Sequence, residues 1–524
     1  MKTVFFSLLA CNLYAINSVV AQNTKPNIIM FLVDDMGWQD TSVPFNGNEV
    51  SALNLRYQTP NMERLARLGV KFTQAYSCAI SSPTRCSLMS GMNASRHRVT
   101  NWTLEFDQKT DANSEVIELP DWNYNGIQPE ATKGVINNSV AITSLPQILK
   151  ENGYRTIHCG KAHFGARTTP GADPSNMGFD INIAGGPNGA PGSYLGLKNF
   201  GEGSPFAVKG LEKYHGQDIF LTEALTIEAI KEMKKAVNEK RPFYLYMSHY
   251  AVHTPIEDDK RFSNNYRGKY DRQLKSKLGE KEAKYAALVE GMDKSLGDIM
   301  DYIQSDPKLA QNTIILFMSD NGGQALGYCR EGVPNRDPNY PARAGKGSAF
   351  MGGVREPMLV YWPGVTKPGS ICLQKVIIED FYPSIIEMAG IHDYHTVQIV
   401  DGKSFVRCLK NVSDIDSNKS IVWHFPNLWG ETQDIEEGYG AYSSILKGDY
   451  HLIYNWENGR IRLYNVKDDL SEQIDLSERL PEIVKKLSSE LSDYLRERNA
   501  QRPSLKSNGK ILPYPDGLQQ YEFE

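Results

Sequence analysis

Short apolar runs alternate along the chain with segments of helical periodicity. The run Asn27 to Val33 has no polar alternation, which is typical of a strand buried on both faces of a sheet. Similar runs occur at Thr156 to Cys159, Phe243 to Met247, Thr313 to Met318 and Met358 to Trp362. Each is followed by a polar or glycine-containing loop. The pattern predicts an α/β fold whose large mixed sheet is mostly parallel and is flanked by helices.

Two segments between these runs carry helix signals. Thr59 and Pro60 suit an N-cap and a first-turn proline, and Gly69 suits the end of that helix. A longer helix is predicted from Glu282 to Gln304, because apolar residues recur there at helical spacing. We expect both apolar stripes to pack into the core.

Two segments, 107–138 and 168–202, are rich in Gly, Pro and Asn and show no clear periodicity. They are typical of long surface loops, which often shape the substrate pocket of a compact enzyme.

The pattern changes near Asp401. Three short strands with tight turns are predicted at Ser443 to Leu446, Tyr450 to Asn455 and Arg460 to Tyr464, followed by an amphipathic helix from Leu480 to Arg496. We therefore predict a catalytic domain over residues 22–400 and a smaller C-terminal α+β subdomain with an antiparallel sheet over 401–524.

The first residues predict export. Lys2, an apolar stretch from Val4 to Ala10 and the sequence before Gln22 suit a signal peptide over residues 1–21. A lipoprotein signal that ends at Cys11 is the alternative. No later apolar run reaches the ~20 residues of a membrane span, so we expect export without a further anchor.

Composition adds limits on partners and cofactors. The 524 residues carry a formal charge of -5 with lysines and arginines scattered among acids, which gives no sign of nucleic-acid binding. The cysteines are sparse and lack Cys-x-x-Cys spacing, so they do not suggest a zinc site.

Acidic residues follow two of the predicted strands. Asp34 and Asp35 come directly after the first run, and Asp320 and Asn321 follow the run that ends at Met318. Open α/β sheets place ligands at such carboxyl ends. Three carboxylates and one amide oxygen, without His or Cys, suit Ca²⁺ or Mg²⁺ better than zinc. Taken alone, Asp34 and Asp35 could form an acidic loop, and Asp320 and Asn321 could form an ordinary turn.

A third element places a serine at the start of a helix. In the segment from Ser81 to Arg85, Pro83 can begin a helix that ends near Gly91. A group at Ser81 would lie at the positive helix end, one turn from Arg85, where an anion is stabilised. Taken alone, this pattern more often marks a capped helix without catalytic function.

The pattern Ser81-x-Pro83-x-Arg85, followed by Leu88 and by Ser90-Gly91, resembles the signature of type I sulfatases in its serine form. These enzymes belong to the alkaline-phosphatase-like superfamily. The resemblance implies that Ser81 is oxidised to formylglycine, whose hydrate supplies the nucleophilic oxygen, and that Arg85 holds it. It also implies that one calcium ion is bound by the modified residue 81 together with Asp34, Asp35, Asp320 and Asn321.

Further segments are similar to the same family. Gly160 to Gly165 resembles a Gly-Lys-Trp-His-x-Gly stretch, with Ala162 in place of the tryptophan. This resemblance implies that Lys161 contacts the sulfate and that His163 contacts the formylglycine hydroxyl. The segment that begins at His253 is similar to the family's His-x-Pro element. Lys346 resembles the family's glycine-flanked lysine, which touches the sulfate. Met351 departs from the family, which more often has Glu before Gly-Gly-x-Arg-x-Pro.

These roles suit sulfate-ester hydrolysis. Fixed positive charge from calcium, Arg85, Lys161 and Lys346 would stabilise the transferring group. We expect His163 to act as a base, and His253 or Lys346 to protonate the departing oxygen.

The serine form resembles bacterial sulfatases that a radical maturase modifies under anaerobic conditions. Export then implies the periplasm or the cell surface, and a sulfated saccharide, such as a host or dietary glycan, as substrate. Candidate pocket residues are Asn101, Trp102, His424 and Trp429.

Two alternative functions are open. The first is a phosphatase or phosphonate hydrolase that uses Ser81 directly, and the second is an inactive protein that binds sulfated glycans.

Overall fold

The computed structural model describes residues 25–325, 338–430 and 434–520. The predicted signal peptide, residues 1–21, lies outside this part of the chain. Among the described helices, none is both long enough and apolar enough to cross a membrane.

A nine-stranded sheet forms the centre of the molecule, as predicted for an α/β fold. Its strands run in the order β13-β2-β12-β11-β1-β8-β6-β7, with β14 also paired to β2. Their bounds are β1 Asn27–Val33, β2 Val70–Tyr76, β6 Arg155–Gly160, β7 Ile181–Ile183, β8 Phe243–Ser248, β11 Thr313–Ser319, β12 Arg355–Tyr361, β13 Ser370–Cys372 and β14 Val376–Ile377. All neighbouring strands are parallel except β12, which runs antiparallel to β11 and β2.

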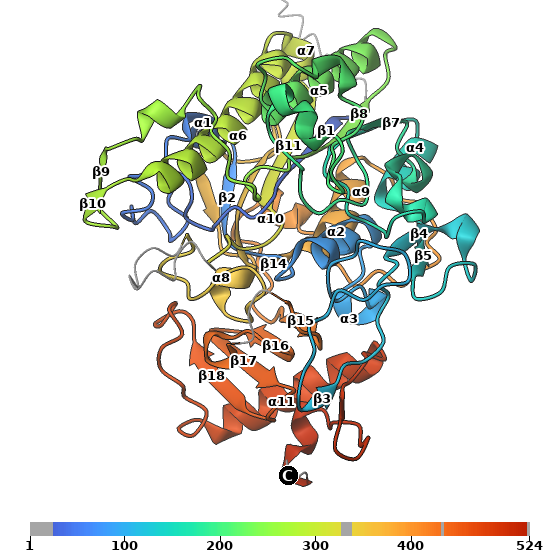
Figure 1. Ribbon diagram of the computed structural model, residues 1–524, viewed down its shortest axis with the longest axis vertical. Helices are drawn as coiled ribbons and strands as arrows, with labels where there is room; N and C mark the ends of the chain where they lie inside the picture. The colour runs from blue at the N-terminus through green and yellow to red at the C-terminus, as the bar shows by residue number, and fades with distance from the viewer. Residues whose placement is uncertain (1–24, 326–337, 431–433, 521–524) are drawn as a thin grey trace, which may run out of the picture.

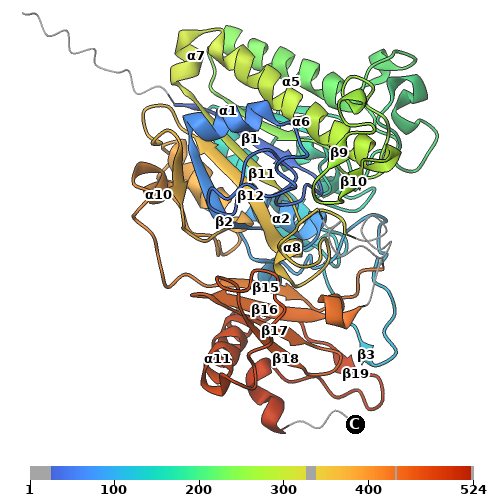
Figure 2. The ribbon, with the colours of Figure 1, turned by 90° about the vertical axis from the view of Figure 1, so that its left-hand side faces the viewer.

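Helices cover both faces of this sheet (Figures 1 and 2). On one face α5 packs against β6 and β8, and α6 packs against α5 and α1; on the other, α2, α4 and α9 contact one another. The helices of this part are α1 Pro60–Leu68, α2 Ser81–Ser90, α3 Ala94–His97, α4 Leu145–Glu151, α5 Leu221–Asn238, α6 Glu280–Gln304, α7 Pro307–Gln311, α8 Met351–Val354, α9 Phe381–Met388 and α10 Val406–Lys410.

The N-terminus of α1 is capped differently from the prediction. Thr59 precedes the helix, but its side chain makes no capping bond and instead contacts the hydroxyls of Thr41 and Ser42. Asp293 of α6 accepts hydrogen bonds from the backbone N–H groups of Asn61 (3.0 Å) and Met62 (2.7 Å). A carboxylate from a neighbouring helix therefore satisfies the helix end.

The C-terminal strands form a separate antiparallel sheet in the order β15-β16-β17-β18. Its strands are β15 Ile421–Phe425, β16 Tyr442–Lys447, β17 Tyr450–Asn455 and β18 Ile461–Asn465, and α11 Pro481–Glu497 packs against it. Figure 2 shows this sheet below the central one. The predicted domain boundary near residue 400 stays a prediction.

The two loop-rich segments contain only short regular elements. Within and beside them lie β3 Ile117–Glu118, β4 Ile127–Pro129 and β5 Val140–Ile142. The first segment reaches the C-terminal part of the chain, because β3 pairs with β19, Ser504–Leu505, in a separate two-stranded sheet (Figure 2). A further two-stranded ribbon joins β9 Tyr270–Asp271 to β10 Ser276–Lys277.

Candidate active site

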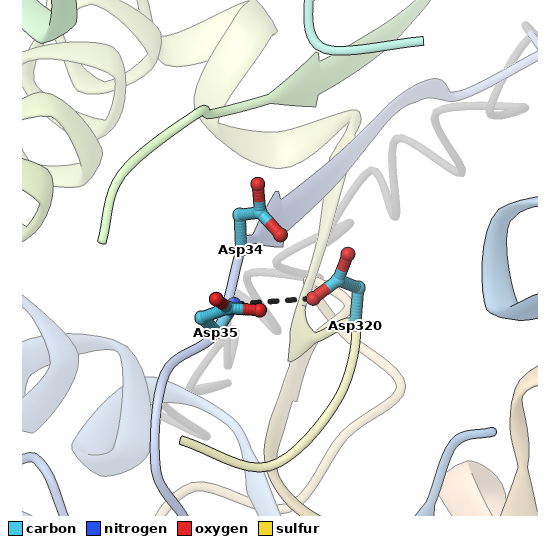
Figure 3. A group of neighbouring side chains, drawn as sticks. All are labelled: Asp34, Asp35 and Asp320. Carbon is cyan, nitrogen blue, oxygen red and sulfur yellow. Dashed lines mark hydrogen bonds between the residues drawn. The ribbon is translucent and has the colours of Figure 1, made fainter. Parts of the chain in front are cut away.

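The site lies where the parallel strands β1 and β11 end. Their register pairs Val33 with Ser319, so the residues that follow each strand emerge at the same edge. Asp34, Asp35 and Asp320 are buried there, with ligand atoms all within 4.8 Å of one another (Figure 3). Two strand ends that the sequence separates widely therefore meet.

The backbone of Asp35 turns sharply at this edge. Its φ is 60°, a left-handed conformation that is uncommon outside glycine. In this conformation its N–H donates to Asp320 Oδ1 over 3.2 Å, the bond drawn in Figure 3. The turn therefore links the two strand ends directly.

Ser81 faces these acidic residues from the first turn of α2. Its Oγ lies 3.1 Å from both Asp34 Oδ1 and Asn321 Oδ1. The Lys161 ammonium donates to the same Oγ over 3.0 Å. The structure thus brings the predicted nucleophile position, the acidic cluster and the first predicted lysine into direct contact.

Arg85 lies one turn further along α2 and is completely buried. Its Nε and Nη2 both donate to Asp320 Oδ2, at 3.0 and 2.8 Å. Its Nη1 donates to Ser248 Oγ (2.5 Å) and to the carbonyl of Lys161 (3.1 Å). The guanidinium is therefore fixed in orientation by the end of β8 and the residue that follows β6, as well as by the acidic edge.

Two lysines complete the balance of charge. Lys161 donates to Asp34 Oδ2 and Lys346 to Asp35 Oδ1, both over 2.7 Å. Burial, reinforced by Asp320, raises the pKa of Asp34, whereas burial lowers the pKa of Lys161. Burial alone would raise the pKa of Asp35, but Lys346 and His253 hold it well below its usual range. By geometry, each of the three acidic side chains is paired with one basic side chain, Arg85, Lys161 or Lys346.

The two predicted histidines line the same cavity as Ser81. His163 Nε2 donates to the carbonyl of Thr103 over 2.8 Å, and its buried Nδ1 has no hydrogen-bond partner. His253 Nδ1 donates to the carbonyl of Thr254 over 2.8 Å, which leaves Nε2 3.6 Å from Asp35 Oδ2. Burial lowers the pKa of both rings, that of His253 to about 4.

The donor set fits a hard divalent cation. Asp35 Oδ2 is buried without a hydrogen-bond partner, and an orphaned buried carboxylate oxygen is costly unless a cation binds it. The Asn321 amide is held by its Nδ2, which donates to Asp35 Oδ1 over 2.8 Å. Three carboxylates and an amide oxygen are ligands of the type that Ca²⁺ and Mg²⁺ prefer.

A cavity of about 270 Å³ opens onto Ser81. Its wall carries the two lysines and two histidines on the side of Ser81, and aromatic side chains of Trp102, Phe206 and Trp429 elsewhere. The remaining lining residues are Ile80, Thr110, Gly189, Ala190, Thr254, Gln324 and Gly430. Thr110, Gly189 and Ala190 come from the two loop-rich segments expected to shape a pocket.

Two of the four predicted pocket residues do not line this cavity. Asn101 is buried behind it and donates to Asp111. Both ring nitrogens of His424 are bonded inside the C-terminal sheet region, to Ser443 Oγ (2.8 Å) and the carbonyl of Gln501 (3.0 Å). The polar groups of Asn101 and His424 hydrogen-bond with neighbouring protein groups. The sequence alone does not reveal these bonds. Phe206, which lies just beyond the loop 168–202, was not predicted.

Fold and site together define a hydrolase of the alkaline-phosphatase-like superfamily. Residues 26–391 match the model of the Sulfatase family, and residues 346–499 match the model described as N-sulphoglucosamine sulphohydrolase, C-terminal. The first match covers well over half of the chain. The chain therefore belongs to the sulfatase family and is a sulfuric ester hydrolase.

Several known proteins are similar to it. A sulfatase of Formosa agariphila is 29% identical and covers 99% of this chain and 98% of its own. The human N-acetylgalactosamine-6-sulfatase is 30% identical over 70% of this chain and 62% of its own. The crystal structure of Ps i-CgsB in complex with k-i-k-neocarrahexaose has a TM-score of 0.67 at 25% identity, covering 91% of this chain and 94% of that one.

Replacing Arg85 tests the balance of buried charge. Arg85→Leu should lower the free energy of unfolding of the unmodified protein in a calcium chelator by about 3 kcal/mol or more, because Asp320 loses the guanidinium that donates two hydrogen bonds to its Oδ2. Tyr246→Phe, which removes one weak 3.4 Å partner of Arg85, should cost no more than about 1.5 kcal/mol. Urea denaturation measures both. Equal stability of Arg85→Leu and the wild type would contradict this account.

Proposed function

We propose that this protein is an exported, calcium-dependent sulfatase that removes an O-sulfate group from a carbohydrate, with formylglycine at position 81. The observation that carries the proposal is the position of Ser81 Oγ, 3.1 Å from Asp34 and Asn321 and 3.0 Å from Lys161. A nucleophile at this point faces both the candidate cation site and fixed positive charge.

Relatives support the carbohydrate part of the proposal. Several similar proteins are N-acetylgalactosamine-6-sulfatases, and the structurally similar Ps i-CgsB was crystallised with a neocarrahexaose. The three aromatic side chains of the cavity give a surface suited to a sugar ring. We propose a host or dietary glycan as the source of this substrate, and the bacterial periplasm or cell surface as the location.

The sulfatase family generally uses calcium and formylglycine. In this site Asp34, Asp35, Asp320 and Asn321 would hold the ion. The ion and the hydrated aldehyde would supply electrophilic activation and a nucleophilic oxygen that an unassisted serine hydroxyl lacks at neutral pH. A radical maturase would remove two hydrogens from Ser81 to produce the aldehyde.

The lysines bind and orient the substrate in this proposal. Lys161 and Lys346 line the cavity beside Ser81, where their ammonium groups can receive the sulfate oxygens. Both are anchored by buried carboxylates at 2.7 Å, so little reorganisation is needed as charge moves toward the departing oxygen.

The histidines hold and move protons. The unpartnered Nδ1 of His163 is the acceptor nitrogen of a neutral ring, because Nε2 carries the proton donated to Thr103. It can take a proton from a hydroxyl at position 81 when sulfate leaves. His253 Nε2, with a side chain 17% exposed, would protonate the departing sugar oxygen once a bound anion favours its charged form. Lys346 is the alternative donor, although Asp35 raises its pKa against the effect of burial.

Modification of Ser81 is directly measurable. Peptide mass spectrometry of active protein from its native host should show a loss of two hydrogens at residue 81. Ser81→Ala should lose activity by at least about a thousandfold, since no nucleophilic oxygen remains. Ser82→Ala, which changes the neighbouring side chain bonded to the N–H of Thr103, is the matched control. Fully active enzyme with an intact serine would contradict the proposal.

Calcium binding is testable on unmodified protein. Calcium should raise the melting temperature, by the linkage between ligand binding and folding, and it should do so more than zinc at equal concentration. Asp320→Asn should abolish the increase, because one carboxylate of the cluster is lost. Asp298→Asn, at an exposed ion pair on α6, should retain it. A stronger response to zinc, with turnover of a phosphate monoester and none of sulfate esters, would favour a phosphatase.

The acid role of His253 predicts a dependence on the leaving group. His253→Ala should reduce kcat/KM by about a hundredfold for a sulfated sugar and by less than tenfold for 4-nitrophenyl sulfate, whose leaving oxygen needs little protonation. Equal losses on both esters would remove His253 from this role. The same comparison with Lys346→Ala would then show whether the lysine supplies the proton.

A further inference from the structure

Asp111 connects three segments of the chain behind the cavity. Its Oδ1 accepts hydrogen bonds from Nδ2 of Asn101 (2.7 Å) and Nδ2 of Asn427 (3.0 Å). Its Oδ2 accepts from Nε1 of Trp122 (2.7 Å). Asn101 and Trp122 belong to the catalytic part of the chain, whereas Asn427 follows β15 of the C-terminal sheet. One carboxylate therefore accepts hydrogen bonds from three separate segments of the chain.

Two of the segments that Asp111 connects each carry a tryptophan of the cavity wall. Trp102 directly follows Asn101, and Trp429 lies two residues after Asn427. Backbone bonds reinforce the connection: Ala112 N–H donates to the carbonyl of Leu428 over 3.0 Å. Thr110 Oγ1 donates to the carbonyl of Trp102 over 2.5 Å. The segment 101–112 and the loop after β15 thus form one bonded unit.

Trp429 also lies against the lysine side of the site. The Lys346 ammonium is 5.9 Å from the centre of a Trp429 ring. A Cβ added to Gly347, whose φ is +88°, would come within 2.3 Å of this indole. The glycine therefore allows the ring to pack on the backbone beside Lys346. A shift of Trp429 would change the wall of the cavity next to the sulfate-binding groups.

We propose that Asp111 is a positioning residue that fixes Trp102 and Trp429 as walls of a subsite for the sugar ring of the substrate. This inference rests on the proposed function. Aromatic side chains bind the apolar face of a ring without requiring charge on it. Among the described lining residues, the cationic or titratable groups are Lys161, His163, His253 and Lys346, all grouped near Ser81. The two indoles offer no charged partner to a second anionic group on the ring, so this part of the described wall suits an otherwise uncharged sugar that carries one sulfate.

The test compares recognition of the sugar with recognition of sulfate. Matured enzyme is assayed on 6-sulfated galactose, N-acetylgalactosamine and N-acetylglucosamine and on a 2-sulfated uronate. We expect the uncharged sugars to be preferred. For the best of them, Asp111→Ala should raise KM by about tenfold, because small displacements of positioning groups have large effects, while the inhibition constant of inorganic sulfate stays within twofold of the wild type. Asp111→Asn keeps one acceptor oxygen for Asn101 and Asn427 and should have a smaller effect.

Asp293→Ala is the matched control for a loss of stability. Asp293 also accepts three hydrogen bonds, all from Asn61 and Met62 at the start of α1, and it does not line the cavity. It should lower stability and leave KM unchanged. An unchanged KM in Asp111→Ala, a parallel rise in the sulfate inhibition constant, or a preference for the uronate would overturn the inference.

Failure of the proposed function can be distinguished from failure of the subsite inference. If matured wild type turns over no sulfate ester, the proposed function is wrong, and calorimetry with N-acetylgalactosamine 6-sulfate then tests the subsite alone. Binding by the wild type that weakens about tenfold in Asp111→Ala supports the subsite. No binding by the wild type overturns it.

Discussion

The arrangement of this enzyme depends on the attraction between three buried carboxylates and three buried cations at one edge of the central sheet. Asp34, Asp35 and Asp320 would repel one another strongly in an interior of low dielectric constant. Arg85, Lys161 and Lys346 come from three other segments and are held by these carboxylates. Removing either set would leave uncompensated charge, so the electrostatics fix the relative positions of the strand ends and of α2.

Much of this site could be predicted from the sequence because its residues occupy ends of regular elements. Strands buried on both faces of a parallel sheet have continuous apolar sequences, and their carboxyl ends meet at one edge. Asp34, Asp320 and Lys161 each directly follow a strand of the central sheet. Ser81 lies in the first turn of a helix. The resemblance to sulfatases then connected elements whose individual patterns were ambiguous.

Other features could not be predicted, because they depend on contacts between distant segments. The apolar run in β12 does not show that this strand is antiparallel to both neighbours. Thr59 has the composition of a cap, yet Asp293 performs that function from another helix. Asn101 and His424 looked available for a ligand, but their polar atoms are bonded within the protein. Side-chain chemistry alone does not distinguish these outcomes.

The pairing of β3 with β19 has a consequence for the order of folding. Segment 101–118 runs from the cavity wall to a ribbon whose other strand, Ser504–Leu505, is synthesised long after it. Closing so long a stretch of chain costs entropy and slows assembly. The central sheet can form, with its charged edge, before segment 101–118 has its pairing strand β19. Catalytic geometry and recognition geometry would then form at different times, the first once the strands up to Ile377 have been synthesised and the second only after Ser504–Leu505 has followed.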